Sequence, residues 1–361
     1  VGKADVRSLK HQLSILDCAN ALDRLLDFQE RLLQYCADHP AYDRDEFTAY
    51  LGTEVFQWLN RSPVRQRILD PLKNFIQQDE SIKRRALEEF RQDRRFPEKI
   101  ADSTYHLRLT DSRFPHQDDL QDMLKNFYEQ FKGRGYPSQV CGKTGGNFTS
   151  DDWWSGFHAK NPQNITCPIC DGTLSGGRSI EHFFPQGTYL AMNVHPFNII
   201  PSCKGCNNDA KAHKDPFNGF SIPQMNVPYL RSIMQDAELS FHEDASGIDI
   251  AEFRPKYPDP SINMRMANLE YLFKIPSRWN ENIQEISDIA IKELCTQLGF
   301  LVQSGEELTD ELVHKGIAQT IRRLQKDWGK FHYQYPATEW LRYAGERKFR
   351  YLYREVIKEL T

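Results

Sequence analysis

The sequence lacks any run approaching the about 20 consecutive apolar residues that a membrane-spanning helix needs, so we expect no membrane partner. Its first ten residues contain no apolar secretory core, and we expect no signal peptide. It also lacks an excess of positive charge, because 46 Lys and Arg face 50 Asp and Glu, a net charge of −4. A polyanion site must therefore be local, metal-assisted or supplied by a partner.

A cysteine framework suited to disulfides is also missing. Four of the eight cysteines are dispersed singly along the chain, and the other four form two CxxC pairs. This placement predicts a reducing compartment with one bound metal, and hence a cytoplasmic protein. The chain contains no internal repeat and no low-complexity tract. Its 361 residues, 39% hydrophobic and 27% charged, are typical of two or three globular domains.

Hydrophobic periodicity divides the chain into three parts. Residues 1–135 show mostly helical spacing, and Gly, Pro, Ser, Asn and Thr then replace that spacing in an irregular module over 136–223. Residues 224–361 begin with a predicted hairpin at Ala237–Phe253 and continue as helices. A short strand is also predicted at Tyr105–Leu109. The fold class that we expect is mostly α, with a small central zinc module between a helical N-terminal domain and a hairpin-plus-helix C-terminal domain.

Two CxxC pairs are the strongest chemical signal in the sequence. Cys167 and Cys170 form the first, and Cys203 and Cys206 form the second. Each tight turn can present two thiolates to one ion at about 2.3 Å, and two turns complete a tetrahedron. Four sulfurs leave no open coordination position, so the predicted Zn²⁺ is structural. The alternative is a set of free or redox-active cysteines.

The segment between and after the two pairs carries polar residues in a characteristic order. An alternating stretch ends in Glu181 and His182, Asn198 precedes the second pair, and Asn207 and Lys211 follow it. In this order the segment resembles the zinc-knuckle branch of the HNH, or ββα-metal, endonucleases. The resemblance covers about residues 165–216 and implies a ββα-metal fold for the module.

The resemblance also implies roles for individual residues. His182 is the implied general base, and its ordinary pKa of about 6.5 suits that role. Asn198 would brace the loop that faces the imidazole, and Asn207 would complete the catalytic set. Lys211 and His213 are the implied phosphate-binding residues.

A catalytic Mg²⁺ or Mn²⁺ is implied as well, with Glu181, Asn207 and Asn208 as its candidate protein ligands. The alternatives of Asn207, Asn208 and His213 for the ligand on the helix stay open. Two departures from the family pattern concern this site. The acidic residue is Glu181 where Asp is more common, and neighbouring strand residues such as Glu181 and His182 point to opposite faces.

Basic residues also gather outside the module. Residues 321–361 contain ten Lys and Arg against five Asp and Glu, interleaved with aromatics, and Lys83–Arg95 is a second basic stretch. Both patterns fit either contact with a nucleic-acid backbone or amphipathic helices with aromatic cores. Residues 136–220 are balanced, with six charges of each sign, and such a module cannot hold DNA tightly by itself.

Together these features predict a metal-dependent HNH endonuclease that hydrolyses DNA, with duplex DNA as the expected substrate. We further expect it to be the effector of a larger bacterial defence complex, with an ATPase or a guide complex as its protein partner. The alternative is a non-catalytic zinc-knuckle scaffold that binds nucleic acid or protein.

Overall fold

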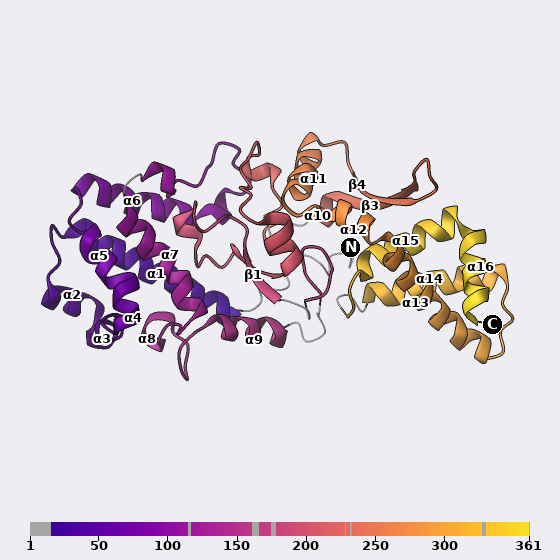
Figure 1. The fold of residues 1–361 in the computed structure, drawn as a ribbon, viewed down its shortest axis with the longest axis horizontal. Helices are drawn as coiled ribbons and strands as arrows, with labels where there is room; N and C mark the ends of the chain where they lie inside the picture. The colour runs from indigo at the N-terminus through magenta and orange to yellow at the C-terminus, as the bar shows by residue number, and fades with distance from the viewer. Residues whose placement is uncertain are drawn as a thin grey trace.

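The computed structural model describes residues 16–114, 117–160, 166–174, 178–227, 229–231, 233–326 and 330–360. Over these residues the chain is mostly helical and carries two small two-stranded antiparallel sheets. The N-terminal and C-terminal helices gather at opposite ends of the long axis, and strand β1 lies between them (Figure 1). This arrangement agrees with the mostly α fold class expected from the sequence, whereas the division at residues 135 and 223 stays a prediction.

The N-terminal end is built from short helices around two long ones. The helical elements of this part are α1 (Leu16–Asp38), α2 (Arg44–Leu51), α3 (Thr53–Leu59), α4 (Ser62–Val64), η2 (Arg65–Leu69), α5 (Asp70–Phe75), α6 (Glu80–Arg94), η3 (Phe96–Lys99), η4 (Asp111–Arg113) and α7 (Asp118–Lys132). Leu22, Leu25, Leu32 and Leu33 of α1 are fully buried. Leu25, Leu32 and Leu33 follow Leu22 by three, ten and eleven positions, which places all four on one face, and this face packs against α6.

The basic stretch of α6 is neutralised within the protein. Arg91 pairs with Glu30 at 2.6 Å, and Arg94 contacts the same carboxylate at 2.9 Å. Lys83 is buried, and its ammonium donates to two backbone carbonyls. Of the two interpretations that the sequence left open for this stretch, the structure favours the amphipathic helix.

The predicted strand at Tyr105–Leu109 is wrong. This segment forms no strand, and the buried carboxylate of Asp93 accepts the backbone N–H groups of Arg108 and Leu109 at 2.7–2.8 Å. Burial raises the pKa of Asp93 to about 7, although those hydrogen bonds favour its ionised form. A side chain thus takes the place of a sheet partner.

Two helices occupy the region that the sequence predicted to be irregular. They are α8 (Ser138–Cys141) and α9 (Ser150–Lys160), and both pack against α1. Asp152, in the first turn of α9, accepts from the backbone and hydroxyl of Thr149 and from Lys143. The prediction missed α9 because the Gly- and Ser-rich residues before it hide its short pattern.

The central segment contains the first sheet. Its elements are β1 (Arg178–His182), η5 (Leu190–Met192), β2 (Ile199–Cys203), η6 (Gly205–Lys211) and η7 (Ile222–Gln224). Strands β1 and β2 are antiparallel, with Arg178 opposite Cys203 and His182 opposite Ile199. The wide turn η6 follows β2 directly, so two strands and a helical turn surround the second CxxC pair.

The C-terminal end begins with the predicted hairpin, which is confirmed. Its strands are β3 (Ala237–Glu243) and β4 (Asp249–Pro255). At the turn, the Asp244 carboxylate accepts from the Ser246 and Ile248 N–H groups, and Gly247 has a positive φ of 79°.

Helices precede and follow this hairpin in the chain. They are α10 (Ile233–Asp236), α11 (Pro260–Phe273), α12 (Ile275–Glu281), α13 (Ile283–Gln303), α14 (Asp310–Lys326), α15 (Gln334–Arg347) and α16 (Phe349–Leu360). The aromatic side chains of Tyr335 and Trp340 are buried in the core of this part. Among the described residues, no helix is both long and apolar enough to cross a membrane.

Candidate metal centre and the neighbouring histidine

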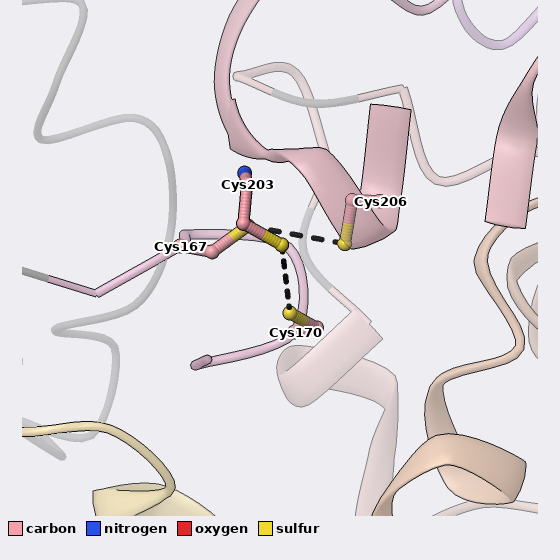
Figure 2. Close-up of side chains that lie close together, drawn as sticks. All are labelled: Cys167, Cys170, Cys203 and Cys206. Atoms are coloured by element: carbon pink, nitrogen blue, oxygen red, sulfur yellow. Dashed lines mark hydrogen bonds between the residues drawn. The ribbon is translucent and has the colours of Figure 1, made fainter. Parts of the chain in front are cut away.

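The four cysteines of the two CxxC pairs converge. All four sulfurs lie within 4.8 Å of one another, and all four side chains are buried (Figure 2). Cys167 Sγ is 3.9 Å from Cys206 Sγ, and Cys170 Sγ is 3.7 Å from Cys203 Sγ. Sulfurs at the corners of a tetrahedron around Zn²⁺, each about 2.3 Å from the ion, would be about 3.8 Å apart. The cluster therefore fits one ion such as Zn²⁺, as the spacing predicted.

The local backbone supports thiolates at these positions. The N–H of Gly172 points at Cys170 Sγ and the N–H of Cys203 points at Cys167 Sγ, each at 3.4 Å. Burial raises the pKa of Cys167 far above its ordinary value, whereas hydrogen bonds with Cys167 and Cys206 lower the pKa of Cys170. Four thiolates this close repel one another, so a cation is required for all of them to ionise together.

Helix α12 and the start of α15 hold the cluster from the C-terminal side. Arg278 Nη1 is 3.1 Å from Cys206 Sγ, and Trp279 Nε1 donates to the Cys170 carbonyl at 2.9 Å. Although burial alone would lower the pKa of Arg278, the thiolates beside it raise that pKa overall. The residue after the first pair, Asp171, has a positive φ of 61° and accepts the backbone N–H groups of Tyr333 and Tyr335 at 2.8 Å.

Glu181 and Lys211 form a buried ion pair on one face of β1. Their side chains are 2% and 1% exposed, and Lys211 Nζ lies 2.8 Å from Glu181 Oε1. Burial raises the pKa of Glu181 to about 7, even though Lys211 lowers it. The structure thus brings together Glu181, a predicted metal ligand, and Lys211, a predicted phosphate-binding residue. The two side chains bind each other.

The other candidate ligands for the divalent cation lie in η6 or just after it. The Asn207 amide group donates to the hydroxyl of Ser179 and to the carbonyl of Ile180, while Asn208 and His213 are exposed. In the described part of the chain, the four cysteines are the only group of three or more His, Cys, Asp or Glu side chains close enough to share an ion. With Glu181 neutralised by an ammonium, the residues present do not fit a Mg²⁺ or Mn²⁺ site in this arrangement.

His182 faces the opposite side of β1 from Glu181, as strand alternation requires. Its Nε2 is 2.9 Å from the Asn193 carbonyl, and its ring meets the Tyr128 ring edge-on, with centroids 4.3 Å apart. Because a carbonyl only accepts, Nε2 carries the proton and the lone pair of the neutral ring is on Nδ1. Burial lowers the pKa of His182 to about 4, so the imidazole is neutral at pH 7.

Asn198 ties together the loop that supplies the carbonyl for His182. Its Oδ1 accepts from the Phe184 N–H at 2.7 Å, and its Nδ2 donates to the carbonyls of Phe184 and Met192 at 3.0 and 2.9 Å. The side chain is fully buried. Since Met192 precedes Asn193, these bonds hold in place the carbonyl that orients the imidazole.

Several contacts of this site could not be found from the sequence. Arg278 and Trp279 lie in a helical stretch that is far from the cysteines in the sequence, and no local motif identifies them. Tyr128 and Lys132 belong to α7 and appeared only as part of a helical pattern. Lys132 Nζ lies over the Tyr128 ring, 5.4 Å from its centroid, on the helix that covers His182.

Comparisons with known proteins give two partial matches. The chain is 22% identical over 158 residues to protein ea31 of Escherichia phage lambda, which covers 44% of this chain and 47% of that protein. It is 32% identical over 68 residues to the Septu protein PtuB of Bacillus thuringiensis, which covers 18% of this chain and 26% of that protein. The matches therefore span about half of one curated relative and about a quarter of the other.

No protein-family profile matches the sequence, and no solved structure matches it. Two findings thus concern the family resemblance of the central segment. They are the distant similarity to a Septu protein and the buried four-cysteine cluster.

Proposed function

We propose that this chain is an HNH-type endonuclease that hydrolyses phosphodiester bonds of DNA, with His182 as the general base. The observation that carries the proposal is the imidazole at the end of β1. It is neutral, its tautomer is fixed by the Asn193 carbonyl, and its strand is paired with one that ends at a zinc ligand. A positioned, unprotonated base is what activation of a water molecule needs.

The proposed step is attack by water on a backbone phosphorus. His182 Nδ1 takes a proton from the water, the water oxygen bonds to phosphorus, and the bond to the 3′ oxygen breaks. The products are a 5′ phosphate and a 3′ hydroxyl, whose proton comes from solvent. A pKa of about 4 makes His182 a weak base, but a bound phosphate dianion or diester would raise that pKa by its negative charge.

Positive charge near the phosphate is the second requirement of this reaction. Lys211, the phosphate-binding residue that the resemblance implies, is bound to Glu181 at 2.8 Å, on the side of β1 opposite His182. A divalent cation, when bound, would add charge on the departing oxygen. We keep Mg²⁺ or Mn²⁺ as the proposed cofactor because the family resemblance implies it, and we assign no ligands to it in the present arrangement.

The proposed setting is a bacterial defence complex. The similarity to the Septu protein PtuB supports it, together with the resemblance of the zinc module to HNH modules that sit in defence systems beside an ATPase or a guide complex. The balanced charge of the central segment also fits a module that depends on other parts of the chain, or on a partner, to bind DNA.

A second function is favoured by one specific observation. The four-cysteine cluster is linked to α12 and α15 by Arg278, Trp279 and Asp171, so it joins parts of the chain that are distant in sequence. A non-catalytic zinc-knuckle scaffold for nucleic acid or protein would need this linkage and nothing more.

Plasmid nicking by the native chain and two matched variants separates these functions. His182→Gln keeps a donor for the Asn193 carbonyl but removes the base, and we expect cleavage to fall by about a hundredfold or more. His195→Gln is the control, because His195 is also buried and also bonds a backbone carbonyl, that of Arg94. Reactions contain Mg²⁺, Mn²⁺ or no added divalent cation.

The results divide clearly. Loss of nicking in His182→Gln alone supports the proposed base. Equal nicking by both variants removes His182 from the mechanism. An inactive native chain that still binds DNA or protein favours the scaffold.

A further inference from the structure

We infer that the C-terminal end of α7 is the surface that holds the nucleic-acid backbone beside His182, an inference that rests on the proposed function. Three cations, Arg67, Lys132 and Arg134, form this surface, which we call the α7 edge. All three side chains are exposed. The sequence did not mark them, because they come from η2, from the last turn of α7 and from the loop that follows it.

The three cations are brought together at Gly133. Lys132 and Arg134 flank this glycine, and Arg67 Nη1 lies only 3.9 Å from the position that a Cβ on it would take. The loop is fixed as well, because the Asn147 amide group donates to the Arg134 carbonyl at 2.7 Å. The α7 edge is therefore a defined cluster on a held backbone.

The α7 edge adjoins the proposed base through one aromatic ring. The Tyr128 ring contacts the His182 ring at 4.3 Å, and the Lys132 ammonium lies 5.4 Å from the centroid of that same Tyr128 ring. The ammonium is thus within about 10 Å of the imidazole, and phosphates of one strand follow each other every 3.4 Å or so along the duplex axis. A strand whose scissile phosphate is at His182 has its next phosphates at the α7 edge.

The cations of the α7 edge have few carboxylate partners among the described residues. Lys132 has one partner, Glu129 at 3.5 Å, and both side chains are about half exposed. Among the described residues, no carboxylate pairs with Arg67 or Arg134. By contrast, several basic side chains of α6 and of the C-terminal helices have carboxylate partners, namely Arg84, Arg91, Arg94, Arg323, Arg342, Lys348 and Lys358.

A polyanion fits this surface better than an acidic protein does. Protein interfaces need an apolar centre with cations at its rim. The exposed large apolar side chains of the described residues lie elsewhere, namely Tyr50, Ile248, Tyr257, Phe300, Val302, Tyr351 and Ile357. Two guanidinium groups and an ammonium without such a centre suit phosphate oxygens, which guanidinium groups bind through paired hydrogen bonds.

The test compares two triple variants with the same change of charge. Arg67→Gln/Lys132→Gln/Arg134→Gln removes the α7 edge. Arg84→Gln/Arg350→Gln/Arg354→Gln removes three exposed cations from α6 and α16 and is the control. Both are made in a His182→Gln background, so that bound nucleic acid stays intact.

Binding of a fluorescein-labelled DNA duplex, and of single-stranded RNA of the same sequence, is measured by anisotropy over a range of salt concentrations. Loss of the α7 edge is expected to weaken binding by about tenfold or more at low salt and to reduce the slope of log K against log salt by about 2 to 3. The control triple is expected to stay within about threefold. Zinc content and thermal unfolding of each variant show that the fold is kept.

The inference is overturned if both triples bind like their parent, if both lose affinity equally, or if the parent binds neither nucleic acid. Nicking assays distinguish this failure from failure of the proposed function. Unchanged KM for DNA cleavage in the α7-edge triple, made with His182 intact, would keep the endonuclease and remove the edge. Edge-dependent binding without any cleavage would keep the edge and remove the endonuclease.

Discussion

At the scale of residues, the buried contact between Glu181 and Lys211 determines what these two side chains are bound to. The family pattern marks both side chains for ligand binding, yet in the structure each neutralises the other in an almost fully buried position. Residue types and order could be predicted from the sequence because motifs are local. The pairing could not, because it depends on how η6 lies against β1.

Lys211→Met should destabilise the protein strongly. It leaves the Glu181 carboxylate buried without a partner, which typically costs about 3 to 5 kcal/mol. The raised pKa of Glu181, about 7, lets protonation offset part of that cost near neutral pH. We expect a loss of about 3 kcal/mol in the free energy of unfolding, measured by urea denaturation at pH 7 with zinc present.

Two further variants test the cause of that loss. Lys214→Met is the matched control, since Lys214 donates only to a backbone carbonyl and should cost about 1 kcal/mol. Adding Glu181→Gln to Lys211→Met should restore most of the stability. A Lys211→Met protein as stable as Lys214→Met would show that the ion pair contributes little.

At the scale of elements, the four-cysteine cluster joins segments that are short. The first CxxC turn belongs to neither strand, β1 and β2 have five pairs between them, and η6 spans seven residues. The CxxC spacing alone predicted the cluster, because thiolate geometry is nearly independent of the rest of the fold. Its attachment to α12 and α15 was unpredictable, since those contacts join residues more than 70 positions apart.

Alternating patterns were less informative at this scale. Tyr105–Leu109 alternates like a strand, but Asp93 takes the N–H groups that a neighbouring strand would have accepted. Ser179–His182 alternates in the same way and does form a strand, because β2 is available beside it. Periodicity reports which side chains face inward and not what satisfies the backbone.

Removal of zinc should loosen this group of elements first. A chelator leaves four buried sulfurs without an ion. Burial then favours the neutral thiol of Cys167 and of Cys206, and Arg278 loses its thiolate partner. We expect hydrogen exchange to rise in β1, β2, η6 and α12 while α1 and α6 stay protected, measured by mass spectrometry. Cys170→Ser should reproduce the pattern without a chelator. Unchanged exchange in β1 and β2 would show that the ion does not hold the sheet.

At the scale of the whole molecule, two buried histidines connect the central segment to the N-terminal helices. His182 packs on Tyr128 of α7, and His195 Nε2 bonds the Arg94 carbonyl of α6 at 3.1 Å. In His195 the second ring nitrogen accepts from the Phe197 N–H at 3.3 Å, so a neutral ring satisfies both contacts. Protonation would therefore weaken this junction.

Acidification should remove the stabilisation that the two neutral histidines provide. Asp93 and Glu181 act with the opposite sign, because burial raises the pKa of each carboxyl to about 7 and the folded chain therefore binds more protons there. Burial lowers the pKa of both His182 and His195 from 6.5 to about 4, so between these values the two histidines bind more protons in the unfolded chain than in the folded one. The stabilisation is present above pH 6.5 and is lost as pH falls. Each histidine should cost about 1 kcal/mol between pH 7 and pH 5.5, measured by urea unfolding.

Variants separate this effect from proton competition at the cysteines. Between pH 7 and pH 5.5, the unfolding free energy of His182→Gln and of His195→Gln should each change more favourably than that of the native chain, by about 1 kcal/mol, with zinc content measured at every pH. A dependence that is as steep in both variants would assign the acid sensitivity to other groups.

The last pair of the β1–β2 ladder, Arg178 opposite Cys203, ends in a side chain that a metal would tether. A five-pair ladder has little of its own to resist sliding by one position, and such a shift would turn every β1 side chain over. The imidazole would then look toward Lys211, and the carboxylate toward Tyr128. If Cys203 is bound to the same ion as Cys167, Cys170 and Cys206, this shift in register cannot occur. An ion with no part in the chemistry would therefore determine which side of the sheet carries the base.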